Sequence, residues 1–331
     1  MRGRFLVVAI LLGSLLGCTV RSPSTSLPTR PWTAVPPSPT ATPTATPRPT
    51  VGPTPTPTPV PTAVPVDVEL RVEPVQIEPG HTLVVRLLSP WPVMAEGTLG
   101  EATLPFVSCD GGRLHTALVG IPVDAPEGPR WVVVRWQDAA GHADLLTATV
   151  ELLPMRYPIE TIYLQPDRAA LLDPEIVSAE WERLVPIWDT WFPERLWSGD
   201  FITPTRGHIS SAFGTLRSYD GGPPTSYHNG VDISNPEGTL VVAAARGRVV
   251  LAERLQVRGN AVILDHGWGV HSAYYHLSAI LVEVGEMVEA RQAIGRMGET
   301  GLATGPHLHW EVRLGEVPVD PWEWVHGGGK F

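Results

Sequence analysis

The sequence predicts a mainly β protein with two folded domains, a β-sandwich and a second β-sheet-rich domain, joined by a short helical linker. Three observations lead to this fold class. Short alternating apolar runs between turn residues fill residues 66–153, a helical pattern covers 173–191, and strands with glycine turns resume from Phe201. Strands alternate their side chains between two faces, whereas helices repeat every 3.6 residues, so the two patterns are separable.

Composition limits the classes of protein that fit. A chain of 331 residues is long enough for two domains, and 43% hydrophobic residues can bury a core in each. The 24 Lys and Arg residues are outnumbered by 34 Asp and Glu, which gives a net charge of −10. Because there is no basic run, we expect no nucleic-acid partner.

Residues 1–18 have the pattern of an export signal. Arg2 and Arg4 precede the apolar stretch Phe5 to Leu16, which is short for a membrane span. The following Leu15-Leu16-Gly17-Cys18 resembles the lipobox of bacterial lipoproteins. The resemblance implies cleavage before Cys18, lipidation of its thiol, and anchoring to the bacterial cell membrane on the side that faces the cell wall. An ordinary signal peptide is the alternative.

The chain has two cysteines, Cys18 and Cys109, and the fate of one affects the other. A disulfide between them would compete with lipidation of Cys18. Lipidation would instead leave Cys109 as an unpaired thiol, whose usual place is the core.

Residues 19–65 form a Pro/Thr-rich segment, for which we predict a disordered, extended linker. Such a segment can act as a spacer between an anchor and a folded domain. Residues 66–153 then alternate as in Val68-Leu70-Val72, with further strands at 131–136 and 145–152. This spacing predicts a small sandwich and resembles an immunoglobulin-like domain, with a role as a spacer or binding module.

Residues 154–200 are predicted to be the helical linker. Asp173-Pro174-Glu175 suits a helix N-cap and first turn, and Pro186 must end or kink the helix. The apolar residues of this segment could share one face and pack on the next domain.

Residues 201–327 hold two histidine patterns, His228-Asn229-Gly230-Val231-Asp232 and His307-Leu308-His309. On a strand, residues i and i+2 point to the same face, so His307 and His309 enter one space. Catalytic zinc takes three protein ligands, usually imidazoles with an occasional carboxylate, and two His with one Asp fit that count. The spacing leaves open which three residues bind.

Residues from about Gly199 to Val325 resemble the lysostaphin/LytM-type zinc metallopeptidases. The resemblance implies a lysostaphin-like fold, a duplicated hybrid motif of β-sheets. The matching stretches, in the family's order, are Ser211 to Gly214, His228 to Asp232, Gly259-Asn260, Asp265 to Gly267, Tyr274 to Leu277, Thr300 to Glu311 and Pro318 to Pro321.

Matched by position, the resemblance implies one zinc ion held by His228, Asp232 and His309. It implies His276 and His307 as catalytic histidines, and Asn229 and Tyr274 are candidates to line the site. Zinc acts as a Lewis acid and acidifies its water, while a nearby imidazole can accept a proton.

The implied activity is zinc-dependent hydrolysis of peptide cross-links or stem peptides in peptidoglycan. Within the pair of catalytic histidines, we expect His307 to be the base and His276 to orient or stabilise charge. The alternative is a protein that binds the cell wall and activates another hydrolase. The presence of all five implied histidine and aspartate residues favours the enzyme.

Overall fold

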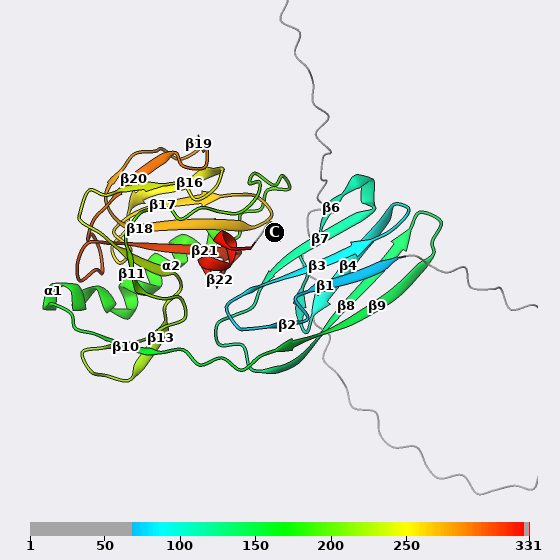
Figure 1. Ribbon diagram of the computed structural model, residues 1–331, viewed down its shortest axis with the longest axis horizontal. Helices are drawn as coiled ribbons and strands as arrows, with labels where there is room; N and C mark the ends of the chain where they lie inside the picture. The colour runs from blue at the N-terminus through cyan, green and yellow to red at the C-terminus, as the bar shows by residue number, and fades with distance from the viewer. Residues whose placement is uncertain (1–67, 328–330) are drawn as a thin grey trace, which may run out of the picture. The chain divides into compact units, whose positions relative to one another are not determined.

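The computed structural model describes residues 68–327 and Phe331, and strands make up most of its regular structure (Figure 1). The mainly β fold class is therefore confirmed. The predicted signal sequence, the Pro/Thr-rich linker and Cys18 lie outside the described residues. None of the helices in the described part is long and apolar enough to cross a membrane.

The first part of the described chain consists of two sheets around one core. Val132, Val134 and Trp136 of β8 are buried, and they share a hydrophobic cluster with Leu83 and other residues of β3. The sheet orders are β1-β3-β7-β6 and β2-β9-β8-β4-β5. The bounds are β1 Glu69–Glu73, β2 Gln76–Ile77, β3 Thr82–Leu88, β4 Val93–Leu99, β5 Ala102–Thr103, β6 Val107–Cys109, the 3-10 turn Asp110–Gly112, β7 Leu114–Gly120, β8 Gly128–Asp138 and β9 Ala143–Leu152.

Cys109 is the last residue of strand β6 and is partly buried. The lipidation of Cys18 and the state of the Cys109 thiol stay predictions. The assignment of these two sheets to the immunoglobulin-like class stays a prediction.

The linker contains the predicted helix, and also a strand that the sequence did not predict. Helix α2 spans Pro174–Trp188, and the carboxylate of Asp173 caps it by accepting a 2.8 Å hydrogen bond from the Glu175 amide. Pro186 lies in the last turn, two residues before the helix ends. Before the helix come strand β10 (Ile159–Ile162), α1 (Pro166–Ala169) and the 3-10 turn Ala170–Leu172.

The rest of the chain builds one large and one small sheet. The large sheet has the order β11-β14-β21-β18-β17-β16-β19, with β15, β20 and β22 attached, and the small one is β10-β12-β13. The bounds are β11 His208–Ser211, β12 Leu216–Tyr219, β13 Pro224–Tyr227, β14 Val231–Ser234, β15 Leu240–Val242, β16 Gly247–Arg254, β17 Asn260–Asp265, β18 Val270–Ile280, β19 Met287–Val288, β20 Ala293–Met297, β21 His307–Leu314, β22 Val317–Val319 and α3 Pro321–Val325.

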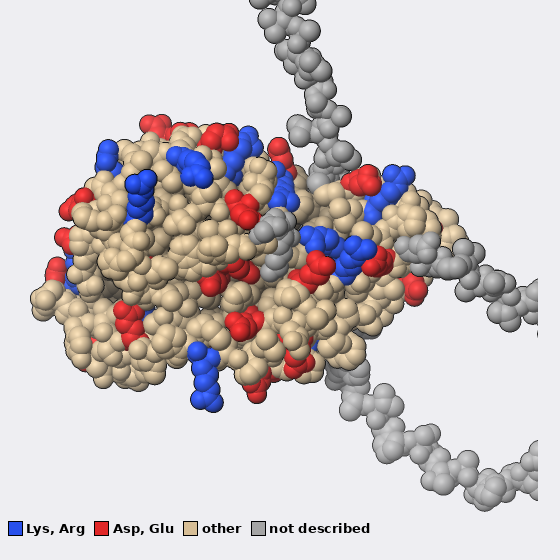
Figure 2. Space-filling view, viewed as in Figure 1, with Lys and Arg blue, Asp and Glu red and all other residues tan. Residues whose placement is uncertain are grey.

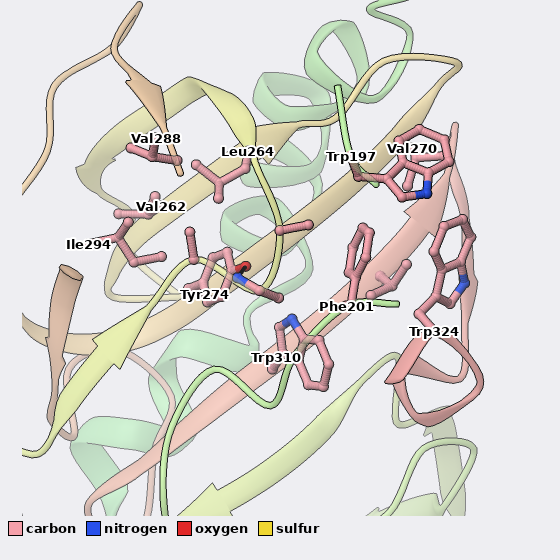
Figure 3. Packing of buried hydrophobic residues seen from close by; sticks show 14 of the residues in the cluster. Trp197, Phe201, Val262, Leu264, Val270, Tyr274, Val288, Ile294, Trp310 and Trp324 are labelled. Atoms are coloured by element: carbon pink, nitrogen blue, oxygen red, sulfur yellow. Dashed lines mark hydrogen bonds between the residues drawn. The ribbon is translucent and has the colours of Figure 1, made fainter. Parts of the chain in front are cut away.

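Both faces of the central strands β17 and β18 are covered. On one face, Val262, Leu264, Tyr274 and Trp310 belong to the main core cluster, which also holds Trp197, Phe201 and Trp324 (Figure 3). On the other face, Leu184, Ile187 and Trp188 of α2 form a second cluster with residues of β17 and β18. This two-sided burial explains why the burial pattern of β18 is continuous from Val270 to Leu277 rather than alternating.

Charged side chains are interspersed on the face of the molecule drawn in Figure 2, where acidic and basic residues alternate without a continuous patch of one sign. Surface charge therefore does not mark a site on that face. The candidate site is instead recognised from ionisable side chains that are buried.

Candidate metal centre

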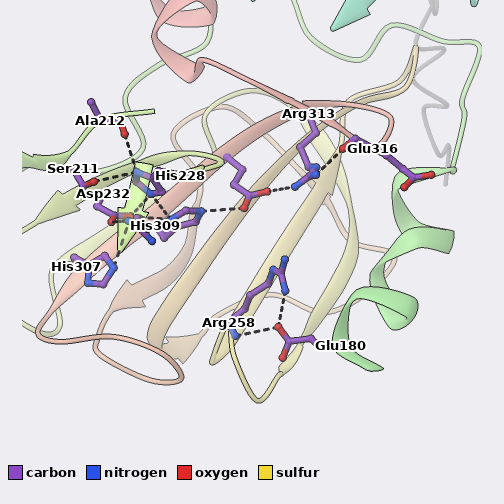
Figure 4. A network of polar contacts seen from close by, with 12 residues as sticks. Glu180, Ser211, Ala212, His228, Asp232, Arg258, His307, His309, Arg313 and Glu316 are labelled. Atoms are coloured by element: carbon purple, nitrogen blue, oxygen red, sulfur yellow. Dashed lines mark hydrogen bonds and ion pairs between the residues drawn. The ribbon is translucent and has the colours of Figure 1, made fainter. Parts of the chain in front are cut away.

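Three side chains meet where strands β14 and β21 lie side by side. In this antiparallel pairing Asp232 lies directly opposite His309. Oδ1 of Asp232 lies 2.8 Å from Nδ1 of His309 and 3.0 Å from Nε2 of His228, and the two ring nitrogens are 2.9 Å apart (Figure 4). The turn from His228 to β14 depends on Gly230, because a Cβ there would come within 2.3 Å of the Trp310 carbonyl oxygen.

The outer nitrogens of the two imidazoles fix which inner nitrogen carries a lone pair. Nδ1 of His228 lies 2.9 Å from the carbonyl oxygen of Ala212, and Nε2 of His309 lies 3.0 Å from Oε1 of Glu311. A carbonyl or an ionised carboxylate can only accept, so each of these outer nitrogens must be the N–H donor. In the neutral tautomers, Nε2 of His228 and Nδ1 of His309 therefore direct lone pairs toward Oδ1 of Asp232.

A convergence of three acceptors fits a cation. Ligands of a tetrahedral zinc ion at about 2.0–2.1 Å lie about 3.3 Å apart, so the three atoms need to separate by only a few tenths of an ångström. The donor set of two imidazoles and one carboxylate is that of a catalytic zinc site, which keeps one further position open. Among the described residues, His228, Asp232 and His309 are the His, Cys, Asp or Glu side chains that converge in this way.

The charges around the centre also favour a cation. Burial opposes ionisation of Asp232, yet the neighbouring rings of His228 and His309, when protonated, hold its pKa well below the ordinary value. Burial likewise opposes protonation of His309, but hydrogen bonds to Asp232 and Glu311 outweigh it and raise the pKa of His309. The centre thus combines an ionised carboxylate with a histidine whose protonated form is stabilised by two neighbouring carboxylates.

His276 and His307 lie next to this centre. Their ring centroids are 4.8 Å apart, and Nε2 of His307 is 3.8 Å from Oδ1 of Asp232. Nδ1 of His276 bonds to the carbonyl oxygen of Thr300 at 2.8 Å, and Nδ1 of His307 bonds to that of Gly305 at 2.8 Å. The same reasoning about acceptors assigns the lone pair of each neutral ring to Nε2.

Burial is the main cause that holds the pKa of His276 well below its ordinary value, and the charges that His307 and His309 can carry lower it further. His276 is therefore neutral at neutral pH and acts as a hydrogen-bond acceptor at Nε2. It also has a φ of 60°, which is uncommon for a residue with a side chain, and its amide donates to the Arg258 carbonyl. Both features hold the ring in one position.

The two residues expected to line the site, Asn229 and Tyr274, have different surroundings in the structure. Asn229 is partly exposed beside His228. Tyr274 does not line the site, because it is fully buried in the main core and its hydroxyl accepts from the Ala244 amide at 2.8 Å. Strand alternation turns the next residue, Tyr275, toward the centre, where its ring stacks on His309 at 5.6 Å and 9°.

Sequence reasoning gave no role to three further residues, of which Glu311 and Arg217 contact the centre directly and Glu160 reaches it through the hydroxyl of Ser211. Glu311 follows His309 by two residues on β21, so the period of two could have identified it. Arg217 on β12 and Glu160 on β10 reach the centre from the small sheet, and no local pattern reveals that pairing. A cavity of about 280 Å³ beside them is lined by Glu160, Arg217, Asp232 and His307, among others.

The part of the chain that holds the metal centre is also the part that resembles known proteins. Residues 226–321 match the family model described as Peptidase family M23. A segment of 116 residues is 39% identical to the peptidoglycan DD-endopeptidase ShyA of Vibrio cholerae and covers 35% of this chain and 27% of that protein. Another of 94 residues is 44% identical to the DD-carboxypeptidase/endopeptidase Mpg of Neisseria meningitidis and covers 28% of this chain and 22% of Mpg.

The chain thus spans about a quarter of the length of these curated relatives. Among solved structures, one from Pseudomonas aeruginosa described as a peptidase M23 is 27% identical. The match covers 76% of this chain and 94% of that one, with a TM-score of 0.55.

Proposed function

We propose that this protein is a zinc metalloendopeptidase that hydrolyses peptide cross-links or stem peptides of bacterial peptidoglycan, because residues 226–321 match the model of peptidase family M23. The observation that carries the proposal is the convergence of two imidazole lone pairs and one carboxylate oxygen within 3.0 Å of one another, with two more histidines beside them. The peptidoglycan DD-endopeptidase relative supports the substrate class.

His228, Asp232 and His309 would hold one zinc ion in this site. When bound, zinc would supply Lewis acidity toward the scissile carbonyl and bring the pKa of a water molecule to about 7. Asp232 stays ionised for this task, since its neighbours His228 and His309 hold its pKa well below the ordinary value. Glu311 and the Ala212 carbonyl orient the two imidazoles from outside.

His307 is the proposed general base. Its Nε2 carries the lone pair, lies 3.8 Å from Oδ1 of Asp232 and borders the cavity in which a peptide can bind. It accepts the proton of the attacking water there and later donates it to the leaving amine. His276, which is neutral, accepts a hydrogen bond at Nε2 and so orients the water against His307.

The alternative function is a binding protein that activates another wall hydrolase. Such a protein has no need for five converging metal-binding and catalytic side chains in one place. The geometry of His228, Asp232 and His309 therefore favours the enzyme over the activator.

The test is zinc stoichiometry combined with product analysis. Purified protein is expected to contain one zinc per chain and to release peptides from defined peptidoglycan, as followed by mass spectrometry, with and without a chelator. A protein that binds no zinc and releases nothing by itself, yet stimulates a second hydrolase, would establish the activator function instead.

The location of the enzyme is part of the proposal. Export followed by a lipid anchor on Cys18 would keep the catalytic part at the bacterial cell membrane and facing the cell wall. The segment 19–65 would act as a spacer, and the two sheets before the linker as a further spacer or a binding module.

A further inference from the structure

We propose that the small sheet β10-β12-β13 is part of the metal centre, with Arg217 positioning Asp232 and Glu160 positioning His228. The inference rests on the proposed zinc site and extends it to a strand of the linker. Both residues precede residue 226, where the match to the family model begins. The functional unit would therefore begin earlier in the chain than the family match does.

Arg217 contacts the oxygen of Asp232 that does not face the imidazoles. Its Nη2 donates to Oδ2 of Asp232 at 2.5 Å, while Oδ1 faces His228 and His309. The two side chains are 18% and 9% exposed, so water contributes little to fixing their orientation. A guanidinium that holds one carboxylate oxygen leaves the other as a single ligand atom with a defined direction.

Glu160 acts on His228 through one intervening hydroxyl. Oγ of Ser211 donates to Oε2 of Glu160 at 2.8 Å and lies 3.2 Å from Nδ1 of His228. Because Glu160 takes the single hydroxyl proton, Ser211 can only accept from His228, together with the Ala212 carbonyl. Both acceptors keep the proton on Nδ1 and the lone pair on Nε2, the nitrogen that faces Asp232.

The register of the small sheet explains why these two residues act together. Strand β10 pairs in parallel with β12, and Glu160 is the partner of Arg217 in that pairing. Partners in register project to the same face of a sheet, and both residues line the cavity beside Asp232 and His307. One face of the small sheet thus presents a cation to the carboxylate ligand and an anion toward an imidazole ligand.

Variants of Arg217 in the full chain test the first contact. The zinc dissociation constant, measured by competition with a chelator, is expected to weaken about 10–100-fold in Arg217→Met, which has no donor. Arg217→Gln keeps an N–H donor without the charge and should recover most of the affinity. Arg246→Met is the control, because its partner Glu289 lies in an exposed ion pair away from the centre.

Variants of Glu160 test the second contact. Glu160→Leu should weaken zinc binding and change the visible spectrum of the cobalt-substituted protein, because His228 loses a constraint on its tautomer. Glu160→Gln retains an acceptor oxygen for Ser211 and should restore the wild-type spectrum. Glu253→Leu, which removes an exposed partner of Arg183, serves as the matched control.

The outcomes separate this inference from the proposed function. A wild-type protein without zinc would refute the proposed function itself. If the wild type binds zinc and Arg217→Met binds it equally well or more tightly, the positioning role is wrong, since the guanidinium would then merely repel the metal. Urea unfolding of the metal-free variants checks the fold, and if Arg217→Met does not fold, the Glu160 pair decides the question.

Discussion

Glu311 accepts a hydrogen bond from Nε2 of His309 at 3.0 Å, two residues further along the same strand. Its second oxygen accepts from the buried guanidinium of Arg313 at 2.7 Å. Burial opposes ionisation of Glu311, but Arg313 and His309 hold its pKa well below its ordinary value. A carboxylate thus links the candidate metal ligand to a buried cation.

Substitution of Glu311 should separate metal affinity from stability. Glu311→Gln keeps the shape and an acceptor, so we expect zinc affinity to fall about 10–100-fold with the fold retained. Glu311→Ala leaves Arg313 buried without its carboxylate and should lower the free energy of unfolding by about 3–5 kcal/mol. Chelator competition and urea unfolding measure the two effects, and equal zinc affinity in the wild type and Glu311→Gln would contradict the role of Glu311 in orienting His309.

Substitutions of the two histidines on β21 should have different effects, although they are only two residues apart. His309→Ala removes a ligand and is expected to abolish both zinc binding and peptidoglycan cleavage. His307→Ala should keep stoichiometric zinc but lower turnover about 10²–10⁴-fold, the usual contribution of a general base. Metal analysis and the rate of peptide release check these outcomes, and near-normal turnover of His307→Ala would show that another group is the base.

His266 and His271, two buried histidines outside the centre, should make the free energy of unfolding depend on pH. Burial lowers the pKa of His266 to about 4 and that of His271 to about 3. In the unfolded chain each titrates near pH 6.5, so the unfolded state binds the proton first as the pH falls. Each should therefore reduce the free energy of unfolding by about 1.4 kcal/mol per pH unit from pH 6.5 down to its folded pKa.

His266→Gln removes one of these two contributions. In chelator-treated protein, the slope of unfolding free energy against pH between 6.5 and 4 should be shallower than in the wild type by about 1.4 kcal/mol per unit. Above pH 7 both histidines are neutral in both states, so this substitution should leave the slope there unchanged. Identical slopes below pH 6 would mean that His266 is protonated in the folded protein.

Substitution of Gly230 tests the strand pairing that brings Asp232 and His309 together. Gly230→Ala would place a methyl group within 2.3 Å of the Trp310 carbonyl oxygen, and backbone atoms cannot rotate away as a side chain can. We expect a lower melting temperature and weaker zinc binding. Gly238→Ala, at an open turn, is a control for folding alone, although its positive φ brings some strain.

The lipid anchor predicts that Cys18→Ser moves the protein from the membrane fraction to the soluble fraction. A disulfide between Cys18 and Cys109 is the competing fate, since the chain has two cysteines. Mass spectrometry of the mature N-terminus distinguishes a lipid-modified cysteine from a disulfide. Unchanged fractionation of the variant would reject the anchor.

Much of the centre could be predicted because strand periodicity is a local property. His307 and His309 were expected on one face of a strand, and the structure brings them together with His228 and Asp232. The prediction that Tyr274 lines the site was wrong for a related reason. The same alternation turns Tyr274 into the core and its neighbour Tyr275 toward His309. The resemblance located the motif, but only the register of β18 shows which tyrosine faces the centre.

Strand β10 could not be predicted because its pairing is not local. Its four residues follow Pro158, and its partner β12 begins at Leu216, far along the chain. A short strand of this kind forms only when the distant partner is in place. The helix was easier, since its Asp173 cap and its apolar face are local features of the sequence. The predicted range 173–191 starts one residue before α2 and ends three residues after it.

The direct pairing of Asp232 with His309 has a practical consequence for preparing this protein. A slip of one residue between β14 and β21 would turn one of the two ligands to the opposite face of the sheet. Molecules with that error would bind no metal, however compact they were. The zinc content of a refolded sample would therefore measure the fraction of chains in the native register, and a shortfall would report misfolding that a circular dichroism spectrum does not resolve.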